Sequence, residues 1–211
     1  MNGSLDLDEV ARRPGRYWNA DGLPETVMGG LWILWGAASL LPSVLPAGNW
    51  LAVYSTLVPV VLVTSGLLAN RLVRRLKERV TFPRAGYVAW KEPGAARLIG
   101  ACAAAAVVAG IVALLAAVSR QGPTAALVTP AAGTLVAAAL AFVAARQRLP
   151  RFAILAVVAV ALGFGLPRAV GAWEIELGLL FLGLGLASLA TGAVRLRRFL
   201  RSTPLPQEPG P

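Results

Sequence analysis

The sequence predicts an all-α protein, a polytopic transmembrane helical bundle of about six spans arranged as three hairpins. The chain of 211 residues is 57% hydrophobic and only 14% charged, whereas a soluble domain carries about 25% charged residues. Its apolar residues also form long runs, and about 20 residues at about 1.5 Å per residue cross a hydrocarbon core of roughly 30 Å. Within the hydrocarbon core we expect helices, because a helix satisfies the hydrogen bonds of its backbone amides within one segment.

The apolar runs divide the chain into three parts. Residues 1–26 are polar and are expected to form a cytoplasmic N-terminal segment, and the proline-rich end, 203–211, is expected to be a disordered tail. The six-span domain, 27–202, lies between them, and its expected spans are 27–45, 50–68, 98–118, 125–145, 152–166 and 175–194. Spans pair as hairpins, and one long loop, 69–97, separates the second from the third. The short fifth run needs the stretch up to Trp173, with Arg168 reaching outward, to cross the bilayer.

Basic residues are distributed unevenly around these spans. If the N-terminus lies inside, the inside segments hold 18 of the 20 Lys and Arg residues, and only Arg120 and Arg168 lie outside. This positive-inside pattern predicts a multi-pass protein with both termini in the cytoplasm. The net charge of +10 then faces anionic lipid at the cytoplasmic surface, so no nucleic-acid partner is expected. Arginine greatly outnumbers lysine and Ala, Val and Gly are abundant, a composition associated with GC-rich bacterial genomes, so the expected location is the bacterial inner membrane.

Several chemistries are excluded by residue type. The chain has no histidine and a single cysteine, Cys102, which rules out a Ser–His dyad, a His-ligated zinc or haem, and a CxxC redox pair. We therefore expect no cofactor, no metal, no catalytic residue and no enzyme activity. Glu25 lies in the first turn of the first span, and Glu174 and Glu176 lie in the first turn of the sixth. Carboxylates at these positions complement the helix dipole. The alternative for these acids is a role in the passage of an ion or substrate.

Small residues recur at helical spacing within the spans, which lets neighbouring backbones approach closely. The ridges are Gly183, Ala187 and Thr191, then Gly178, Gly185 and Gly192, then Gly133, Ala137 and Ala141. They are interpreted as packing within one bundle, with a dimer interface as the alternative. The pattern Glu25-x3-Gly29-x6-Gly36 also echoes Glu174-x3-Gly178-x6-Gly185. We interpret the echo as coincidence or convergent packing.

Two prolines within spans suggest a polar pocket. Pro59 and Pro130 each remove a backbone amide beside hydroxyl-bearing residues. The candidate pocket residues are Tyr54, Ser55, Thr56, Thr129 and Thr134. If these faces meet, they form a small uncharged cavity for a neutral or weakly polar ligand. The alternative is a helix kink whose polar groups are satisfied internally.

The inside loop 69–97 is the polar region with the clearest pattern. Residues 71–80 are expected to continue the second span as a basic helix, with Leu72, Leu76 and Val80 on one stripe. The chain is then expected to break at Pro83 and to become extended and aromatic. The candidate partner or lipid contacts are Arg74, Arg75, Arg79, Phe82, Arg84, Tyr87 and Trp90. These residues form either a loop that lies in the headgroup layer or a docking surface for a cytoplasmic partner.

Three segments carry a resemblance to a known group of proteins. They are KERVTFPRAGYVAW, RYWNADGLPETVMGGLW and GLASLATGAVRLRRFLRSTPLP. Together they resemble an uncharacterised family of bacterial multi-pass integral membrane proteins of unknown function. The likeness covers the polar edges and the first and last spans, while the middle spans match only as apolar sequence. It implies a membrane protein and supplies no functional residue.

The sequence supports two hypotheses on function. The first is an integral membrane protein without a catalytic site that acts as an accessory or regulatory subunit, with residues 71–92 as its protein contact. The second is a small permease or channel for a neutral or hydrophobic solute, lined by the polar pocket. An intramembrane enzyme comes third, for want of an acid–base pair.

Overall fold

The described residues of the computed structural model are 18–44, 50–85 and 126–204, and they fold entirely into helices, turns and short connections. The helices are α2 (Leu23–Val44), α3 (Trp50–Val80), α4 (Phe82–Ala85), α6 (Val128–Gln147), α7 (Pro150–Ala169) and α8 (Trp173–Ser202). No strand occurs within these ranges, which confirms the all-α class. The tail from 205 onward and the expected third span, 98–118, lie outside them.

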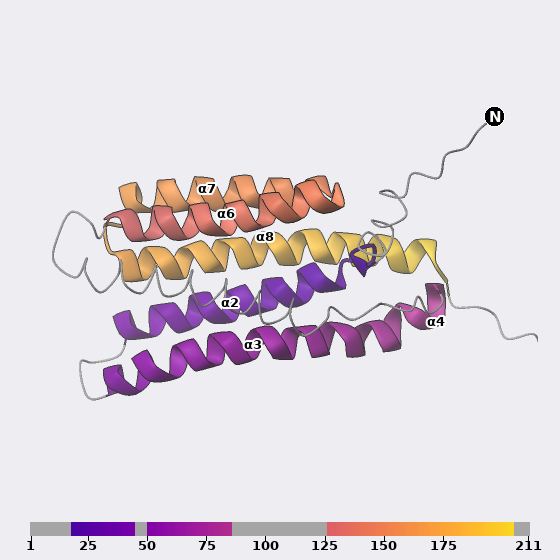
Figure 1. Ribbon diagram of the computed structural model, residues 1–211, viewed down its shortest axis with the longest axis horizontal. Helices are drawn as coiled ribbons and strands as arrows, with labels where there is room; N and C mark the ends of the chain where they lie inside the picture. The colour runs from indigo at the N-terminus through magenta and orange to yellow at the C-terminus, as the bar shows by residue number, and fades with distance from the viewer. Residues whose placement is uncertain (1–17, 45–49, 86–125, 205–211) are drawn as a thin grey trace, which may run out of the picture.

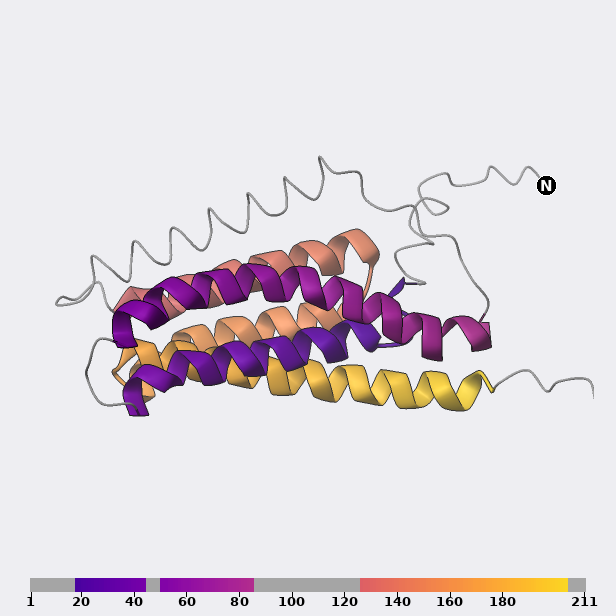
Figure 2. The ribbon, with the colours of Figure 1, turned by 90° about the horizontal axis from the view of Figure 1, so that it is seen from below.

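The long helices lie side by side along one axis (Figure 1). α8 occupies the middle of the bundle and contacts α2, α6 and α7. α2 makes its most extensive contact with α8, although α3 is its neighbour in sequence. When the molecule is turned by 90° about its long axis, the helices again lie side by side, with α3 above α2 (Figure 2). The hairpin α6–α7 and the pair α2–α8 are therefore the main packing units of the described part.

Among the described residues, four helices are long and apolar enough to cross a membrane. These segments are Leu23–Ser43, Val128–Gln147, Pro150–Ala169 and Trp173–Ser202. They correspond to the expected first, fourth, fifth and sixth spans. The fifth is longer than expected, because the helix begins at Pro150 and continues through Pro167. The second expected span forms the first part of α3, and the total of six stays a prediction.

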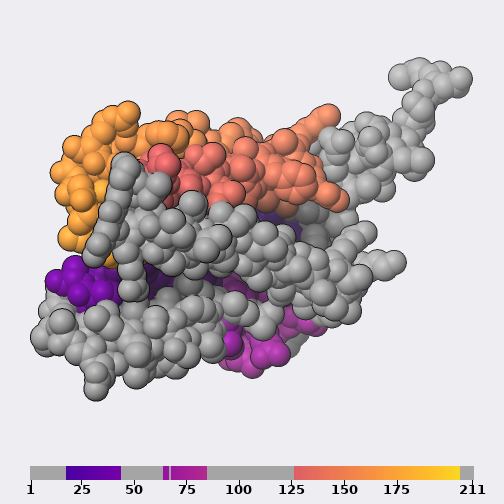
Figure 3. All heavy atoms as spheres, turned by 60° about the vertical axis from the view of Figure 1, so that its left-hand side comes forward, coloured from indigo at the N-terminus to yellow at the C-terminus, as the bar shows by residue number. Residues whose placement is uncertain are grey.

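The outward-facing sides of α6 and α7 are apolar. These helices and the start of α8 form the upper part of the view in Figure 3. Large hydrophobic side chains on these helices are exposed, with Val157 at 67% and Phe142 at 63%. Such surface is unfavourable in water and is compatible with insertion into a membrane.

The start of α2 follows a turn at Asp21 and Gly22, whose residue types, with Pro24 behind them, are typical of a turn before a helix start. Gly22 has φ of 78°, a backbone region that glycine adopts without steric cost. The Oδ1 atom of Asp21 accepts a hydrogen bond from the amide of Leu23 at 3.1 Å, so the carboxylate serves one of the free amides of the first turn. Pro24 lies within that turn, where its missing amide costs nothing.

Glycines spaced seven residues apart form the interface between α2 and α8. A Cβ added at Gly29 would lie 2.8 Å from the carbonyl oxygen of Gly185, and one at Gly36 would lie 2.7 Å from that of Gly178. The two stripes run antiparallel and face each other. The glycines of the two similar sequence patterns therefore pack against each other, which gives the echo a structural role.

Only some residues of the other small-residue ridges lie in contacts between helices. A Cβ on Gly133 of α6 would lie 2.8 Å from the Cα of Gly163 on α7. Ala137 is also buried on this face, whereas Ala141 is exposed. On α8, Gly183 faces the side chain of Leu162. Packing within the bundle accounts for the buried members of these ridges.

Candidate functional site at the basic end of the bundle

Basic residues gather at one end of the bundle, where α2 and α7 begin and α3, α6 and α8 end (Figure 1). We call this the basic end. Its described basic residues are Arg71, Arg74, Arg75, Lys77, Arg79, Arg84, Arg146, Arg148, Arg151, Arg195, Arg197, Arg198 and Arg201. At the opposite end lie Arg168, Glu174 and Glu176. The described part of the chain thus has the charge separation that the sequence predicts.

Asp21 and Lys77 form a buried ion pair at the basic end. The Nζ atom of Lys77 contacts the Oδ2 atom of Asp21, which also accepts a hydrogen bond from Thr81 at 2.7 Å. Asp21 is inaccessible to solvent, and Lys77 is 1% exposed. The same Nζ lies 4.8 Å from the centre of a Trp18 ring, within the range of a cation–π interaction. This contact ties the last turns of α3 to the segment before α2.

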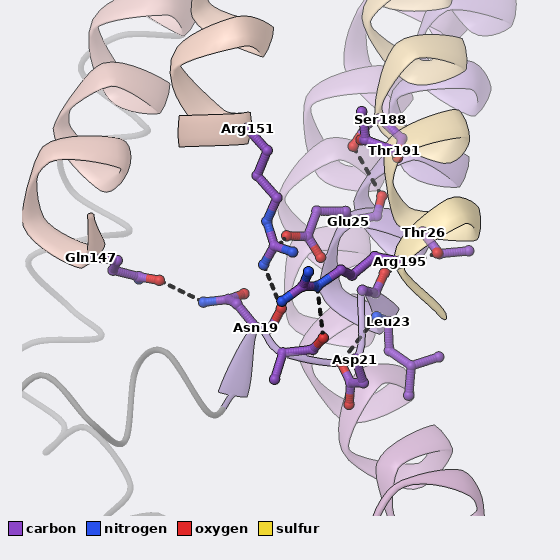
Figure 4. A network of polar contacts seen from close by, with 12 residues as sticks. Asn19, Asp21, Leu23, Glu25, Thr26, Gln147, Arg151, Ser188, Thr191 and Arg195 are labelled. Atoms are coloured by element: carbon purple, nitrogen blue, oxygen red, sulfur yellow. Dashed lines mark hydrogen bonds and ion pairs between the residues drawn. The ribbon is translucent and has the colours of Figure 1, made fainter. Parts of the chain in front are cut away.

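Glu25 and Arg151 form a second ion pair, between α2 and α7. The Nη2 atom of Arg151 lies 2.8 Å from the Oε1 atom of Glu25 and also donates to the carbonyl of Asn19. The side-chain amide of Asn19 donates to Gln147 of α6 at 2.6 Å. Figure 4 shows these groups converging on the segment that precedes α2. Beside them, the Nε atom of Arg195 on α8 donates to the carbonyl of Ala20 at 3.1 Å.

We call Asp21, Glu25, Lys77 and Arg151 the buried charged cluster. It holds two carboxylates and two basic groups, so its charges balance. Taking such groups out of water costs several kcal/mol per ion, which close opposite charges offset. Burial lowers the pKa of Lys77, while the adjacent Asp21 acts in the opposite direction. Glu25 is 2% exposed, and its carboxylate meets Arg151 as an ion pair without hydrogen-bond geometry.

The sequence interpretation of Glu25 was incomplete. Glu25 lies in the first turn of α2, where a carboxylate complements the helix dipole. The structure adds the half-buried Arg151 as its partner. At the opposite end, Glu176 of α8 is also buried and accepts a hydrogen bond from Thr129 at 2.9 Å, whereas Glu174 is exposed.

The predicted contact residues divide between α3 and α4. Arg74, Arg75 and Arg79 are exposed on α3, and Arg74 lies 3.5 Å from the neighbouring Glu78. Phe82 and Arg84 are half-buried on α4. α3 ends at Val80 and the segment 82–85 is a helical turn that includes Pro83, so the expected break at Pro83 into an extended chain is wrong for these residues. Tyr87 and Trp90 lie outside the described residues.

The buried face of the end of α3 differs from the predicted stripe. Leu72 is 49% exposed, and Leu76 and Val80 are half-buried. The buried positions are Val73, Lys77 and Thr81, each four residues from the next. The sequence pattern does not reveal this buried face, because Lys77 resembles a solvent-exposed charge. Its partner Asp21 lies 56 positions away in the sequence.

The predicted polar pocket is not assembled on α6. Thr129 is buried against Glu176, whereas Thr134 is exposed and donates to the carbonyl of Pro130 at 2.8 Å. Five residues correspond to about 140° around a helix, so the two hydroxyls point in different directions. Tyr54, Ser55 and Thr56 lie on α3, and their side chains lie outside the described part of the structure.

A groove lies beside the buried charged cluster, between the start of α7 and the last turns of α8. Its volume is about 480 Å³. It is lined by Leu149, Pro150, Arg151, Ala190, Thr191, Val194, Arg195 and Arg198. We call it the α7–α8 groove.

Sequence reasoning missed Asp21, Lys77 and Arg151 as partners in a cluster. Each of them resembles an ordinary flanking charge in the sequence, and each finds its partner in a different helix or turn. The described residues contain no group of three or more His, Cys, Asp or Glu placed to hold a metal ion. Comparison of the chain with family models, with curated proteins and with solved structures finds no match.

Proposed function

We propose that this chain is a six-span protein of the bacterial inner membrane, related to the multi-pass family that it resembles, and that it acts as a non-catalytic accessory or regulatory subunit. Both termini then lie in the cytoplasm, and the exposed basic side of α3 binds a protein partner there. One observation supports this most directly: α3 and α8 extend past α2, α6 and α7 at the same end of the bundle (Figure 1), and both carry exposed arginines there.

The lengths of the two helices make the extension clear. α3 has 31 residues and α8 has 30, which at about 1.5 Å per residue corresponds to about 45 Å each. A hydrocarbon core takes up about 30 Å of this length. About 15 Å of each helix is therefore available beyond the core at the basic end. The exposed arginines of these ends are Arg71, Arg74, Arg75 and Arg79 on α3, and Arg195, Arg197, Arg198 and Arg201 on α8.

The buried charged cluster supports the same proposal, because it holds the end of α3 in place. Lys77 points inward to Asp21, which orients Arg74, Arg75 and Arg79 outward on the same helix. A surface of this kind, rigid and rich in guanidinium groups, suits an acidic segment of a partner protein. Leu72, exposed in the same region, adds an apolar contact.

The experiment is a pull-down of the tagged full-length protein from its own membranes in mild detergent. We expect a stoichiometric partner to be retained by the unmodified chain and lost when Arg74, Arg75 and Arg79 are all changed to Glu. The matched control changes Arg146, Arg197 and Arg201 to Glu, since these are exposed arginines of the same end outside α3. Retention of the partner by the α3 variant, at an equal amount of protein in the membrane, would show that this surface is not the dock.

The permease remains the second candidate, and it has less support. Its lining was expected to include Thr129 and Thr134, which lie on different sides of α6. Solute flux into liposomes containing the purified protein, above that of empty liposomes, would favour the permease over the accessory subunit.

A further inference from the structure

The α7–α8 groove combines basic and apolar walls. Its lining residues include Arg151, Arg195 and Arg198 together with the apolar Leu149 and Val194. Its volume, about 480 Å³, falls in the range of small-molecule sites. The groove therefore offers an amphipathic molecule both a charged and an apolar surface.

The charges of the groove do not balance. Of its three arginines, Arg151 is paired with Glu25, and the other nearby carboxylate, Asp21, is occupied by Lys77. Arg195 and Arg198 are exposed, and Arg195 lies near enough to Arg151 to repel it. Figure 4 shows the side chains of Arg151 and Arg195 converging beside Glu25. An anion placed here would relieve that repulsion.

The position of the groove along α8 selects the kind of anion. After Glu174 and Glu176 in its first turn, the helix has no charged residue from Leu177 to Val194, and its first basic residue is Arg195. The roughly 20 residues between Trp173 and Arg195 cover about 30 Å, which matches a hydrocarbon core. In the proposed membrane placement, Ala190 and Val194 reach acyl-chain depth, and Arg195 and Arg198 lie at the level of the phosphates.

We propose that the α7–α8 groove is a binding site for one anionic phospholipid of the cytoplasmic leaflet. Arg195 and Arg198 donate hydrogen bonds to the headgroup phosphate, which suits the planar, multidentate guanidinium. The acyl chain lies against Ala190, Val194 and Leu149. This inference rests on the membrane placement proposed above and is independent of the partner surface on α3.

The test is native mass spectrometry of the full-length protein in detergent, with phosphatidylglycerol or phosphatidylcholine added. We expect the unmodified protein to retain one phosphatidylglycerol and the Arg195→Gln/Arg198→Gln variant to bind it about tenfold more weakly, since charge-assisted hydrogen bonds contribute about 1.4 kcal/mol or more. Arg197→Gln/Arg201→Gln is the matched control, because both residues are exposed on α8 and neither lines the groove. An equal loss in the control, or equal retention of the zwitterionic lipid, overturns the site.

A second pair of variants tests the apolar wall without changing charge. Ala190 is exposed and lines the groove, so Ala190→Trp should obstruct it and weaken lipid retention similarly. Leu186, exposed one turn earlier and outside the groove, supplies the control Leu186→Trp. Retention unchanged by Ala190→Trp contradicts the proposal, as does displacement of the lipid by inorganic phosphate at the same concentration. Failure of the membrane placement is recognised separately, by recovery of the unmodified protein outside the membrane fraction.

Discussion

At the scale of single residues, Lys77 is the clearest case of a side chain whose role depends on its surroundings. It follows Arg74 and Arg75 in a basic segment, yet it is buried while they are exposed. The difference comes from its position on the same face as Val73 and Thr81, opposite Asp21. A lysine suits this site because its long stem packs in apolar surroundings while its ammonium reaches the carboxylate.

Replacing Lys77 tests the importance of this ion pair. We expect Lys77→Met to reduce the free energy of unfolding by about 3–5 kcal/mol, because Asp21 then stays buried without its cation. The double variant Lys77→Met/Asp21→Asn should recover part of this loss, since no uncompensated charge remains. The measurement is thermal unfolding in detergent followed by circular dichroism. Arg75→Met is the control on the exposed side of α3, and an equal effect of both single variants would contradict the assignment.

At the scale of the elements, the contact between α2 and α8 depends on the absence of side chains. The backbone of α8 approaches Gly29 and Gly36 so closely that a Cβ at Gly29 would lie 2.7 Å from the amide nitrogen of Leu189. Close approach of this kind allows extensive van der Waals contact between helices in an apolar solvent. Ser188 adds a buried hydrogen bond of 3.0 Å to the carbonyl of Glu25.

Adjacent glycines on α2 provide a matched test of this interface. We expect Gly29→Ala to destabilise the fold by about 1–3 kcal/mol, because the two helix backbones must separate. Gly30→Ala should leave stability unchanged or raise it slightly, since nothing lies within 4 Å of a Cβ at that position and alanine favours helix. The measurement is the thermal unfolding midpoint of each variant in the same detergent. Equal destabilisation by both variants would show that the close contact at Gly29 does not determine the stability of the fold.

At the scale of the whole molecule, a set of polar contacts at the basic end joins the described helices to one another. Residues 19–21 contact α3 through Asp21, α6 and α7 through Asn19, and α8 through Ala20. The segment before α2 thus joins helices that are distant in sequence. At the opposite end, the hydrogen bond from Thr129 to Glu176 connects α6 with α8.

The proposed orientation can be tested with reporters placed on either side of α8. In the proposed orientation Gly171 lies on the outer side of the membrane and Pro204 in the cytoplasm. We therefore expect alkaline phosphatase fused after Gly171 to be active and a green fluorescent protein fused after Pro204 to be fluorescent. The physical reason is the retention of Lys and Arg on the cytoplasmic side. If both fusion points report the same side, α8 does not span the membrane. The reverse assignment would overturn the orientation while leaving the span intact.

Local patterns in the sequence predict the helical class, the turn before α2 and the bounds of the described apolar helices to within a few residues, except that α8 continues to Ser202, beyond the expected end at 194. They also predict the separation of basic residues, because long apolar runs and flanking charges are local properties of the chain. Three features became visible only in the folded chain. α2 packs against α8, Lys77 pairs with Asp21 and Arg151 with Glu25, and the hydroxyls of Thr129 and Thr134 point in different directions. These outcomes depend on which helices become neighbours and how each is rotated, and no local pattern specifies the partner of a glycine stripe or of a single charge.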